Sequence, residues 1–196
     1  GTVGPPVPGV ELRLADDGEV LVRGDMLMRG YRNRPDQTGE AIDADGWLHT
    51  GDVGVLDEDG YLRIVDRKKE LIINSAGKNM SPANIELTLR AASPLIAHAV
   101  CVGDRRPYNV ALLVLDRELL AKSAGGQAPS PEALRGALAA AVEAANTRLS
   151  RVEQIKRFAV VEADWAPGGD ELTPTLKLKR KPIHAKYAVE IERLYS

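Results

Sequence analysis

Residues 60–72 read Gly60-Tyr61-Leu62-Arg63-Ile64-Val65-Asp66-Arg67-Lys68-Lys69-Glu70-Leu71-Ile72, an apolar segment followed at once by a run of charges. The segment 61–65 is predicted to be a strand, and residues 53–56 with the turn 57–60 complete a hairpin with it. The charged residues 66–70 lie between this strand and the next apolar residues. Taken alone, such a run is usually a solvated turn with local ion pairs, each of which contributes little to stability.

The sequence before this hairpin also predicts β structure. Apolar and polar residues alternate over residues 10–14, which is typical of a strand with one buried face. The turn residues 16–18 then lead into the apolar segment 20–22, which completes an earlier hairpin. Residues 29–52 are rich in Gly and Asp and have little periodicity. We therefore expect a loop there, with a short helix near Pro35.

After residue 66 the sequence predicts a mixture of helices and strands. Ser-Pro pairs, which can cap and start a helix, precede two stretches with helical spacing of apolar residues. The expected helices begin at Ser81-Pro82 and Ser130-Pro131, the second with helical spacing as far as Leu149, and include a last one over 183–194. Strands are expected at 98–102, 110–115 and 157–162, and a linker at 125–129. We predict an α+β chain, with a β-rich segment over 1–65 and a small α+β domain over 66–196.

The composition is that of an ordinary folded protein. The 196 residues are 44% hydrophobic and 28% charged, and 26 Lys and Arg against 28 Asp and Glu give a net charge of -2. This balance argues against a nucleic-acid footprint over the whole protein. Cys101 is the only cysteine, which excludes an internal disulfide and a thiolate metal cluster. No apolar run is long enough to span a bilayer, and we expect a cytoplasmic protein.

Residues 47–52 read Trp47-Leu48-His49-Thr50-Gly51-Asp52 and contain a first candidate site. Gly51 lets the backbone approach a ligand closely. The carboxylate of Asp52 can accept hydrogen bonds from two adjacent hydroxyl groups, which is what a ribose presents. The alternative is a turn in which Asp52 accepts hydrogen bonds from nearby backbone N–H groups. From this motif alone the turn is favoured.

A second candidate is a basic segment near the C-terminus, Leu172-Thr173-Pro174-Thr175-Leu176-Lys177-Leu178-Lys179-Arg180-Lys181. Its side chains could form a solvated basic face or a patch that binds an anion or nucleic acid. No aromatic residue alternates with the basic ones, which disfavours single-stranded nucleic acid as the ligand.

These motifs, in this order and at these separations, resemble the adenylate-forming superfamily. The pattern extends from the segment 18–31 to the lysine-rich segment. The superfamily includes acyl-CoA synthetases, aryl-CoA ligases, firefly-type luciferases and adenylation domains, and residues 64–72 and 172–180 are most similar to its long-chain fatty acid–CoA ligases. The resemblance implies that residues 1–65 are the β-rich end of a large adenylation domain. Residues 66–196 would then be the small mobile C-terminal domain.

The resemblance implies that a carboxylate is activated in two steps. ATP and a fatty acid form an acyl-adenylate and pyrophosphate, and CoA then displaces AMP to give the thioester. Asp52 would bind the ribose hydroxyls of ATP or AMP, and Arg67 would also contact the ribose. Asp66 would be the hinge about which the small domain rotates between the steps. Gly77 and Lys78 would lie in the loop on the CoA side.

The resemblance also implies a catalytic lysine. Attack of a carboxylate on the α-phosphate brings two anions together, and an ammonium group both reduces their repulsion and stabilises the transition state. Lys177 is the best positional match, although the superfamily usually has Gly-Lys where this sequence has Leu176-Lys177. Lys179 is a rival, and Lys181 is a more distant one.

Part of the superfamily's active site has no counterpart in this sequence. The phosphate loop rich in Gly, Ser and Thr is absent, and so is the segment that holds the Mg-binding acid. We therefore expect ATP with Mg, and CoA as co-substrate, to be used by a longer protein of which this chain is a piece. The chain alone is expected to be inactive. The three histidines, His49, His98 and His184, have no metal-ligand arrangement, and no metal site is expected here.

Three other functions stay open. The first is a fatty acyl-AMP ligase that loads a carrier protein instead of CoA. The second is a non-catalytic interaction module on the same fold, and the third is a nucleic-acid-binding domain that uses residues 177–181. The acidic net charge argues against the third. The expected partners are fatty acid, ATP and CoA, and peripheral membrane association is compatible with the sequence.

Overall fold

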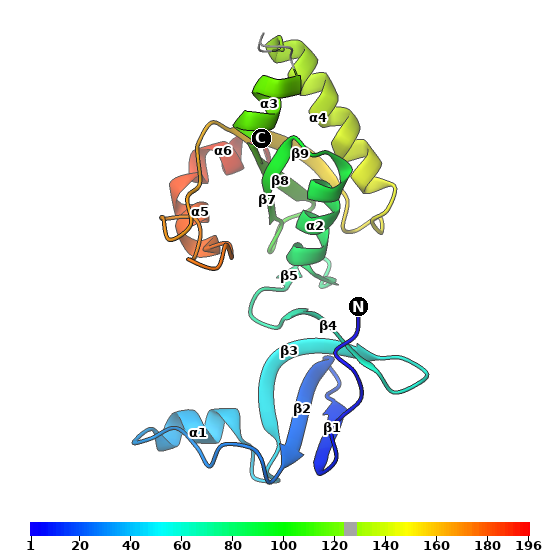
Figure 1. Cartoon of the computed structure of the whole chain (residues 1–196), viewed down its shortest axis with the longest axis vertical. Helices are drawn as coiled ribbons and strands as arrows, with labels where there is room; N and C mark the ends of the chain where they lie inside the picture. Colours follow the sequence, from blue (N-terminus) through cyan, green and yellow to red (C-terminus); the bar gives the residue numbers. More distant parts are fainter. Residues whose placement is uncertain (124–128) are drawn as a thin grey trace. The chain divides into compact units, whose positions relative to one another are not determined.

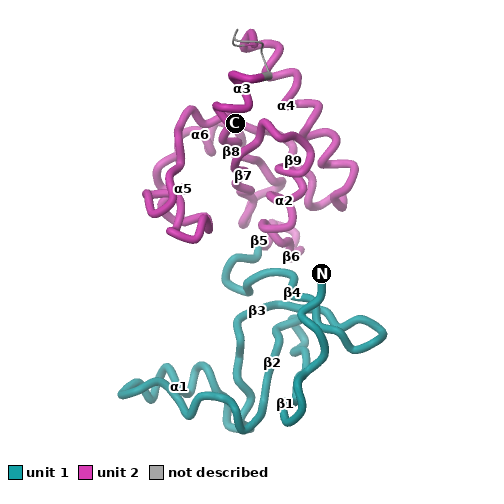
Figure 2. The backbone as a smooth tube through the Cα atoms, viewed as in Figure 1, with its two compact units in different colours: residues 1–71 teal, residues 72–196 magenta. Residues whose placement is uncertain are grey.

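The computed structural model describes residues 1–123 and 129–196, and the chain divides into two units, Gly1–Leu71 and Ile72–Ser196 (Figures 1 and 2). Each unit contains helices and antiparallel strands, so the predicted α+β class is confirmed. The border expected between residues 65 and 66 lies within strand β4 of unit 1. The linker expected at 125–129 lies, except for its last residue, outside the described residues.

Unit 1 is built on a four-stranded antiparallel sheet in the order β1-β2-β3-β4. Its elements are β1 (Val10–Leu14), β2 (Glu19–Gly24), α1 (Pro35–Ala41), β3 (Leu48–Leu56) and β4 (Leu62–Arg67). Both predicted hairpins are confirmed, since Leu14 pairs with Val20 and Leu56 pairs with Leu62. The short helix at Pro35 is also confirmed, and the fixed φ of proline suits its first turn.

The loop expected over residues 29–52 ends earlier than predicted, because residues 48–52 form the first half of β3. Leu48 and His49 pair with Val22 and Leu21 of β2. Pairing with a neighbouring strand, which sequence periodicity does not report, fixes this half of the strand. The correction matters because the predicted ribose-binding residue lies in it.

The apolar core of unit 1 is small. Its buried hydrophobic residues are Val20, Leu21, Trp47 and Leu62. Two guanidinium groups enclose the indole of Trp47, because the Cζ atoms of Arg13 and Arg23 lie 4.3 and 4.5 Å from the ring centroid. Such cation–π contacts contribute roughly 0.5–1 kcal/mol each at exposed sites. Trp47 therefore reports directly on the folding of unit 1.

Unit 2 is built on the sheet β7-β8-β9, in which β8 runs antiparallel to β7 and parallel to β9. Its elements are β5 (Ile72–Ile73), β6 (Asn79–Met80), α2 (Pro82–Ala92), β7 (Ile96–Val102), β8 (Asn109–Leu115), α3 (Arg117–Ser123), α4 (Pro131–Asn146), β9 (Ile155–Val161), α5 (Arg180–Lys186) and α6 (Ala188–Arg193). Side chains of β8 alternate between two apolar clusters. Ala111 and Leu113 pack with α2 and α4, whereas Val110, Leu112 and Val114 pack with α5 and α6. Burial on both faces explains why this strand reads as a continuous apolar run.

The starts of α2 and α4 follow the Ser-Pro signals. The Oγ atoms of Ser81 and Ser130 accept hydrogen bonds from the backbone N–H groups of Asn84 and Ala133 at 3.1 and 3.2 Å. In each case proline occupies the first turn, where its lack of an N–H group costs nothing. Both predicted helix starts are confirmed.

Two predicted helices end differently in the structure. Helix α4 ends at Asn146, before Leu149, and the Asn146 side chain bonds to the backbone at the start of β9. The last helix, expected over 183–194, is divided at Tyr187 into α5 and α6. There the Tyr187 hydroxyl accepts a hydrogen bond from Trp165 Nε1 at 3.1 Å. Both endings depend on tertiary contacts that helical spacing does not report, and α3 is not predicted by the sequence.

Protonation of His98 is expected to destabilise unit 2. Its ring stacks on Trp165 with the centroids 5.7 Å apart. Burial, together with the positive charge of Arg90, lowers the pKa of His98 below its ordinary value. The unfolded chain therefore binds a proton at a higher pH than the folded chain does, and stability is lost as the pH falls below about 6.5.

This pH dependence can be measured by urea unfolding of the Trp47→Phe variant, in which Trp165 is the remaining tryptophan. The unfolding midpoint should fall between about pH 7 and pH 5. Adding His98→Gln should make the midpoint less dependent on pH. An equally steep pH dependence with glutamine at this position would show that His98 is not its source.

Candidate functional site

Asp52 and Arg67, the two residues predicted to bind the nucleotide, lie opposite each other on β3 and β4. Arg67 Nε is 2.7 Å from Asp52 Oδ1, and the two side chains are 66% and 30% exposed. Solvent therefore screens the pair, and its contribution to stability is small. The pair engages one of the five guanidinium N–H donors, so donors and a carboxylate are presented side by side. This arrangement suits a ligand that carries both hydroxyl groups and negative charge.

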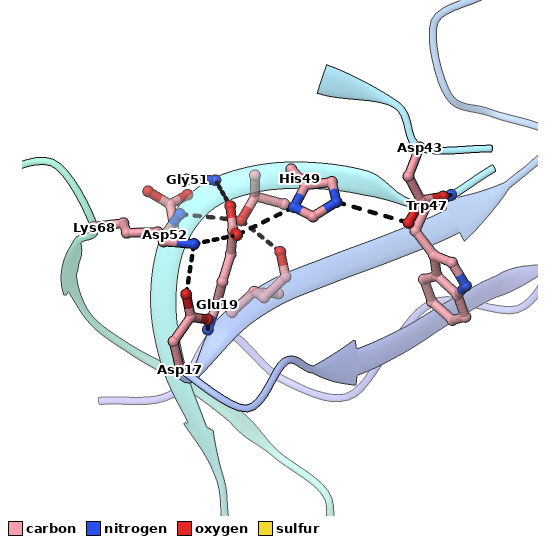
Figure 3. Close-up of polar contacts among 10 residues, drawn as sticks. Asp17, Glu19, Asp43, Trp47, His49, Gly51, Asp52 and Lys68 are labelled. Atoms are coloured by element: carbon pink, nitrogen blue, oxygen red, sulfur yellow. Dashed lines mark hydrogen bonds and ion pairs between the residues drawn. The ribbon is translucent and has the colours of Figure 1, made fainter. Parts of the chain in front are cut away.

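Glu19, at the start of β2, holds the backbone beside this pair (Figure 3). Its buried carboxylate accepts a hydrogen bond from Gly51 N at 3.0 Å and from Lys68 Nζ at 2.9 Å, and it lies 3.1 Å from His49 Nδ1. Burial raises the pKa of Glu19, but these hydrogen bonds outweigh burial and hold the pKa below its ordinary value. A second carboxylate, Asp17, lies 2.6 Å from Lys68 Nζ. The Glu19 carboxylate thus ties β3 to Lys68, the residue that directly follows β4, next to Asp52.

Gly51 and Thr50 set the path of the chain into Asp52. Gly51 has a φ of 71°, a left-handed conformation that costs glycine little. Thr50 Oγ1 donates a hydrogen bond to Val20 O at 2.7 Å and accepts one from Asp52 N at 3.1 Å. In the described part of the chain the Asp52 carboxylate contacts the Arg67 side chain, and no backbone N–H group bonds to it. The alternative of a self-satisfied aspartate turn is therefore not what the structure has.

A hollow of about 500 Å³ in unit 1 adjoins this network. Gly51 and His49 of β3 line it together with Tyr31, and its charged lining combines the cationic residues 67–69 with the acids Glu19 and Glu40. Two of the cations are already paired, Lys68 with Glu19 and Arg67 with Asp52. The hollow therefore offers space and polar groups for a ligand beside Arg67.

Asp66, the predicted hinge, lies within β4 and pairs with Val53 of β3. It is 8% exposed, and its Oδ1 atom accepts a hydrogen bond from Arg67 N at 2.7 Å. Unit 2 begins at Ile72. The structure thus has Asp66 inside the sheet of unit 1, and residues 68–71 follow the strand before unit 2 begins.

Gly77 and Lys78 lie in the turn between β5 and β6. Gly77 has a φ of 74° and donates its N–H to Asn74 O at 2.9 Å. Lys78 N donates to Asn74 Oδ1 at 2.9 Å. A glycine in this left-handed conformation and an asparagine that bonds forward along the backbone are typical of a tight turn. Lys78 is exposed.

Lys177 closes a tight turn over residues 173–177. Thr173 N donates to Lys177 O at 2.8 Å, and Lys177 N donates to Thr173 Oγ1 at 3.0 Å. Leu176 has a φ of 62°, in the left-handed region that favours glycine. Leu176 thus occupies a backbone conformation that glycine adopts at little cost. The Lys177 side chain is exposed, and within the described residues nothing forms a hydrogen bond or ion pair with its ammonium group.

Leu176→Gly is expected to preserve this turn. A left-handed non-glycine residue costs roughly 1–2 kcal/mol, and its removal offsets the greater freedom of glycine in the unfolded chain. The free energy of unfolding should therefore change by less than about 1 kcal/mol. Leu176→Val should lower it, because a β-branched residue is strained at positive φ. Thermal unfolding measures both, and Leu87→Val, at an exposed position of helix α2, is the control for replacing an exposed leucine by valine. A larger loss with glycine than with valine would contradict the assigned conformation.

The basic neighbours of Lys177 are mostly engaged inside unit 2. Lys179 Nζ, the rival, is part-buried and donates to Gly169 O at 2.8 Å. Arg180 forms two hydrogen bonds with Glu86, at 2.6 and 2.9 Å. The basic segment is therefore not a continuous free patch, which weakens the nucleic-acid hypothesis. These contacts also distinguish the two candidate lysines. Lys177 is exposed, whereas the ammonium group of Lys179 is hydrogen-bonded within unit 2.

A family model described as the C-terminal domain of AMP-binding enzymes matches residues 69–196. The chain belongs to this AMP-binding enzyme family. A putative fatty-acid–CoA ligase of Mycobacterium tuberculosis is 57% identical over 204 residues, covering 100% of this chain and 36% of its own length. A long-chain-fatty-acid–CoA ligase of the same species is 45% identical over 206 residues, covering 100% of this chain and 34% of its own length. The chain thus spans about a third of the curated relatives it matches.

The solved structures agree on the fold. The adenylation domain of a carboxylate reductase from Mycobacterium chelonae superimposes with a TM-score of 0.80 at 24% identity, over 97% of this chain and 31% of that one. At this identity the likeness shows the fold alone. The resemblance to adenylate-forming enzymes, and to the long-chain fatty acid–CoA ligase branch in particular, is confirmed.

The sequence analysis missed three buried acids. Glu19, Glu86 and Glu171 are 4%, 6% and 6% exposed, and each forms hydrogen bonds to a segment that contains or adjoins a candidate site residue. A signal existed for two of them. Glu19 directly precedes an apolar strand, and Glu86 shares the buried face of α2 with Leu89. An acid at a position that periodicity assigns to the core must be paired or hydrogen-bonded when it is buried. Such a position therefore indicates a polar contact inside the fold.

Within residues 1–123 and 129–196, no group of three or more His, Cys, Asp or Glu side chains is arranged to hold a metal ion. Over the same residues, no helix combines the length and apolar character needed to cross a membrane.

Proposed function

We propose that this chain is part of an ATP-dependent long-chain fatty acid–CoA ligase that forms acyl-AMP and then acyl-CoA. The observation that carries the proposal is the identity of 57% and 45%, over the whole chain, to two proteins named as fatty-acid–CoA ligases. Because the chain spans about a third of those relatives, it would supply one part of the active site. On its own it is expected to be inactive, and the protein is expected to act in the cytoplasm, with peripheral membrane association compatible.

Asp52 and Arg67 are proposed to bind the ribose of ATP and AMP. The support is their direct pairing at 2.7 Å and the exposure of both side chains. Ribose hydroxyls would donate to the Asp52 carboxylate, while Arg67 keeps free N–H donors for the same ligand. Glu19 would keep the Gly51–Asp52 backbone fixed while this happens. The Mg that accompanies ATP would be held by residues outside this chain.

Lys177 is proposed to be the catalytic lysine of acyl-adenylate formation. The support is its exposed, unengaged ammonium group at the end of a turn with glycine-like backbone geometry. A compact ammonium at the reacting centre stabilises the charge that develops when a carboxylate attacks phosphorus. Lys179 is the less favourable candidate, because its ammonium already donates to Gly169 O.

Asp66 is proposed to be the hinge, with the functional domains 1–65 and 66–196. The family model begins at residue 69 and unit 2 at residue 72, so residues 66–71 would be the segment whose backbone changes. Gly77 and Lys78 are proposed to face CoA in the second step. The exposed glycine turn between β5 and β6 is the feature that supports this role.

The test is a hybrid ligase, in which this chain replaces the matching region of the 57% identical M. tuberculosis protein. It is assayed for AMP release with ATP, a long-chain fatty acid and CoA, and in a second arm with a carrier protein in place of CoA. Thioester formation on CoA is the expected result. Loading of the carrier protein alone would replace the proposal with a fatty acyl-AMP ligase. A hybrid that folds and releases no AMP, while the M. tuberculosis protein does, would overturn the proposal.

A further inference from the structure

We propose that Glu86 and Arg180 form a latch that positions Lys177 for acyl-adenylate formation. The inference rests on the proposed role of Lys177 and adds two positioning residues to it. Neither residue is expected to touch the substrate, since both side chains are largely buried in unit 2, 8% and 18% exposed.

The latch joins three elements at one point. Arg180 Nη1 donates to Glu86 Oε1 at 2.6 Å and Arg180 Nη2 donates to Glu86 Oε2 at 2.9 Å, a bidentate pair between α5 and α2. Glu86 Oε1 also accepts the backbone N–H of Cys101 in β7 at 2.9 Å. Bidentate pairing fixes direction as well as distance, which a lysine in place of the arginine could not do. The start of α5 is therefore held in one orientation against the sheet.

A short backbone ladder transmits this orientation to Lys177. Lys179 N donates to Glu171 O at 2.7 Å, Leu172 pairs with Leu178, and Thr173 N donates to Lys177 O at 2.8 Å. The turn therefore has two arms, residues 171–173 and residues 177–179, and Arg180 directly follows the second arm. Displacement of Arg180 would move that arm and the lysine at its end.

The first arm has its own anchor. The Glu171 carboxylate lies 2.5 Å from Lys186 Nζ and 3.3 Å from the Tyr187 hydroxyl, and Leu172 is completely buried. The second arm is held by Lys179 Nζ, which donates to Gly169 O at 2.8 Å, and by the latch at Arg180, which sets the orientation of the helix that follows the arm. A displacement of about 1 Å at a reacting group can cost on the order of 100-fold in rate. The buried Glu86–Arg180 ion pair would thus influence the position of the exposed Lys177 side chain through the second arm.

A role in stability alone does not explain the latch. Replacing a buried ion pair by uncharged side chains of similar volume is often neutral for stability, whereas removing one partner costs about 3–5 kcal/mol. The double variant Glu86→Gln/Arg180→Met therefore separates the two roles. It removes both charges of the pair at once, and glutamine can still accept the hydrogen bond from Cys101 N. The fold should persist while the orientation of α5 is released.

Hydrogen–deuterium exchange on the 196-residue chain tests positioning without catalysis. In the double variant, the amides of Thr173 and Lys179 should exchange at least about 10-fold faster, equivalent to about 1.4 kcal/mol of lost protection. Protection of β8 should stay as in the parent, which shows that the fold persists. Glu118→Gln, which removes an exposed pair with Lys122 on α3, is the control and should leave both amides unchanged. Unchanged protection of Thr173 and Lys179 in the double variant would overturn the latch.

The hybrid ligase tests the consequence for chemistry. The double variant should lower kcat for acyl-adenylate formation by roughly 10- to 100-fold with little change in the KM for ATP. Thioester formation from supplied acyl-adenylate should stay at the parent rate, and Arg180→Lys should retain part of the adenylation rate. Equal loss in both half-reactions would contradict a positioning role. An inactive parent hybrid would instead count against the proposed function, while the exchange experiment would still decide whether the latch holds the turn.

Discussion

Lys177→Ala in the hybrid ligase is expected to slow acyl-adenylate formation by roughly 100- to 1,000-fold, the usual effect of removing one group that stabilises developing charge. The loss should appear in kcat, because the interaction strengthens in the transition state. Thioester formation from supplied acyl-adenylate should persist, since in that step the thiol of CoA attacks the acyl carbon, AMP leaves, and no bond to phosphorus forms. Single-turnover measurement of both half-reactions provides the comparison.

Lys179→Ala is the matched control, because Lys179 lies two residues from Lys177 on the same short segment. Its ammonium donates to Gly169 O at 2.8 Å, so its removal should cost about 1 kcal/mol of stability. The adenylation rate should fall far less than with Lys177→Ala. If Lys179→Ala shows the selective loss of adenylation and Lys177→Ala does not, the catalytic role passes to Lys179. The glycine-like conformation of Leu176 would then be a feature of the turn without catalytic meaning.

Local signals predicted much of the fold. The hairpins of unit 1 depend on turn residues between short apolar segments, and the starts of α2 and α4 depend on Ser-Pro pairs. Both signals act over a few residues, which is why sequence alone can report them. The first half of β3 and the break at Tyr187 depend on partners distant in sequence, a neighbouring strand and Trp165. No periodicity within the segment encodes either partner.

The candidate site, like the fold, could be predicted from the sequence only in part. The order of motifs was enough to name Asp52 and Arg67, and the structure pairs them across β3 and β4. The groups that hold the site in shape, Glu19 and the latch of Glu86 and Arg180, were not found. Their roles arise from hydrogen bonds between segments 32 and 94 residues apart. An isolated acid in the sequence gives no indication of which distant group it will bind.

Urea is expected to unfold the chain in two steps, with unit 1 unfolding first. The two apolar clusters of unit 2 contain fifteen and eleven buried residues, whereas four buried hydrophobic residues form the core of unit 1. Burial of apolar surface is the main favourable term in folding, so the difference in core size decides the order. Five other apolar residues of the β3–β4 hairpin add little, because they are 39–43% exposed, namely Val55, Leu56, Tyr61, Ile64 and Val65.

The two tryptophans make this order measurable, since Trp47 is buried in unit 1 and Trp165 in unit 2. The Trp165→Phe variant reports unit 1, and the Trp47→Phe variant reports unit 2. For slopes of about 1–3 kcal/mol per molar urea, a difference of a few kcal/mol separates the midpoints by roughly 1 M or more. Coincident midpoints would mean that the chain unfolds as one cooperative body. The small core of unit 1 would then not limit its stability, and the argument from core size would fail.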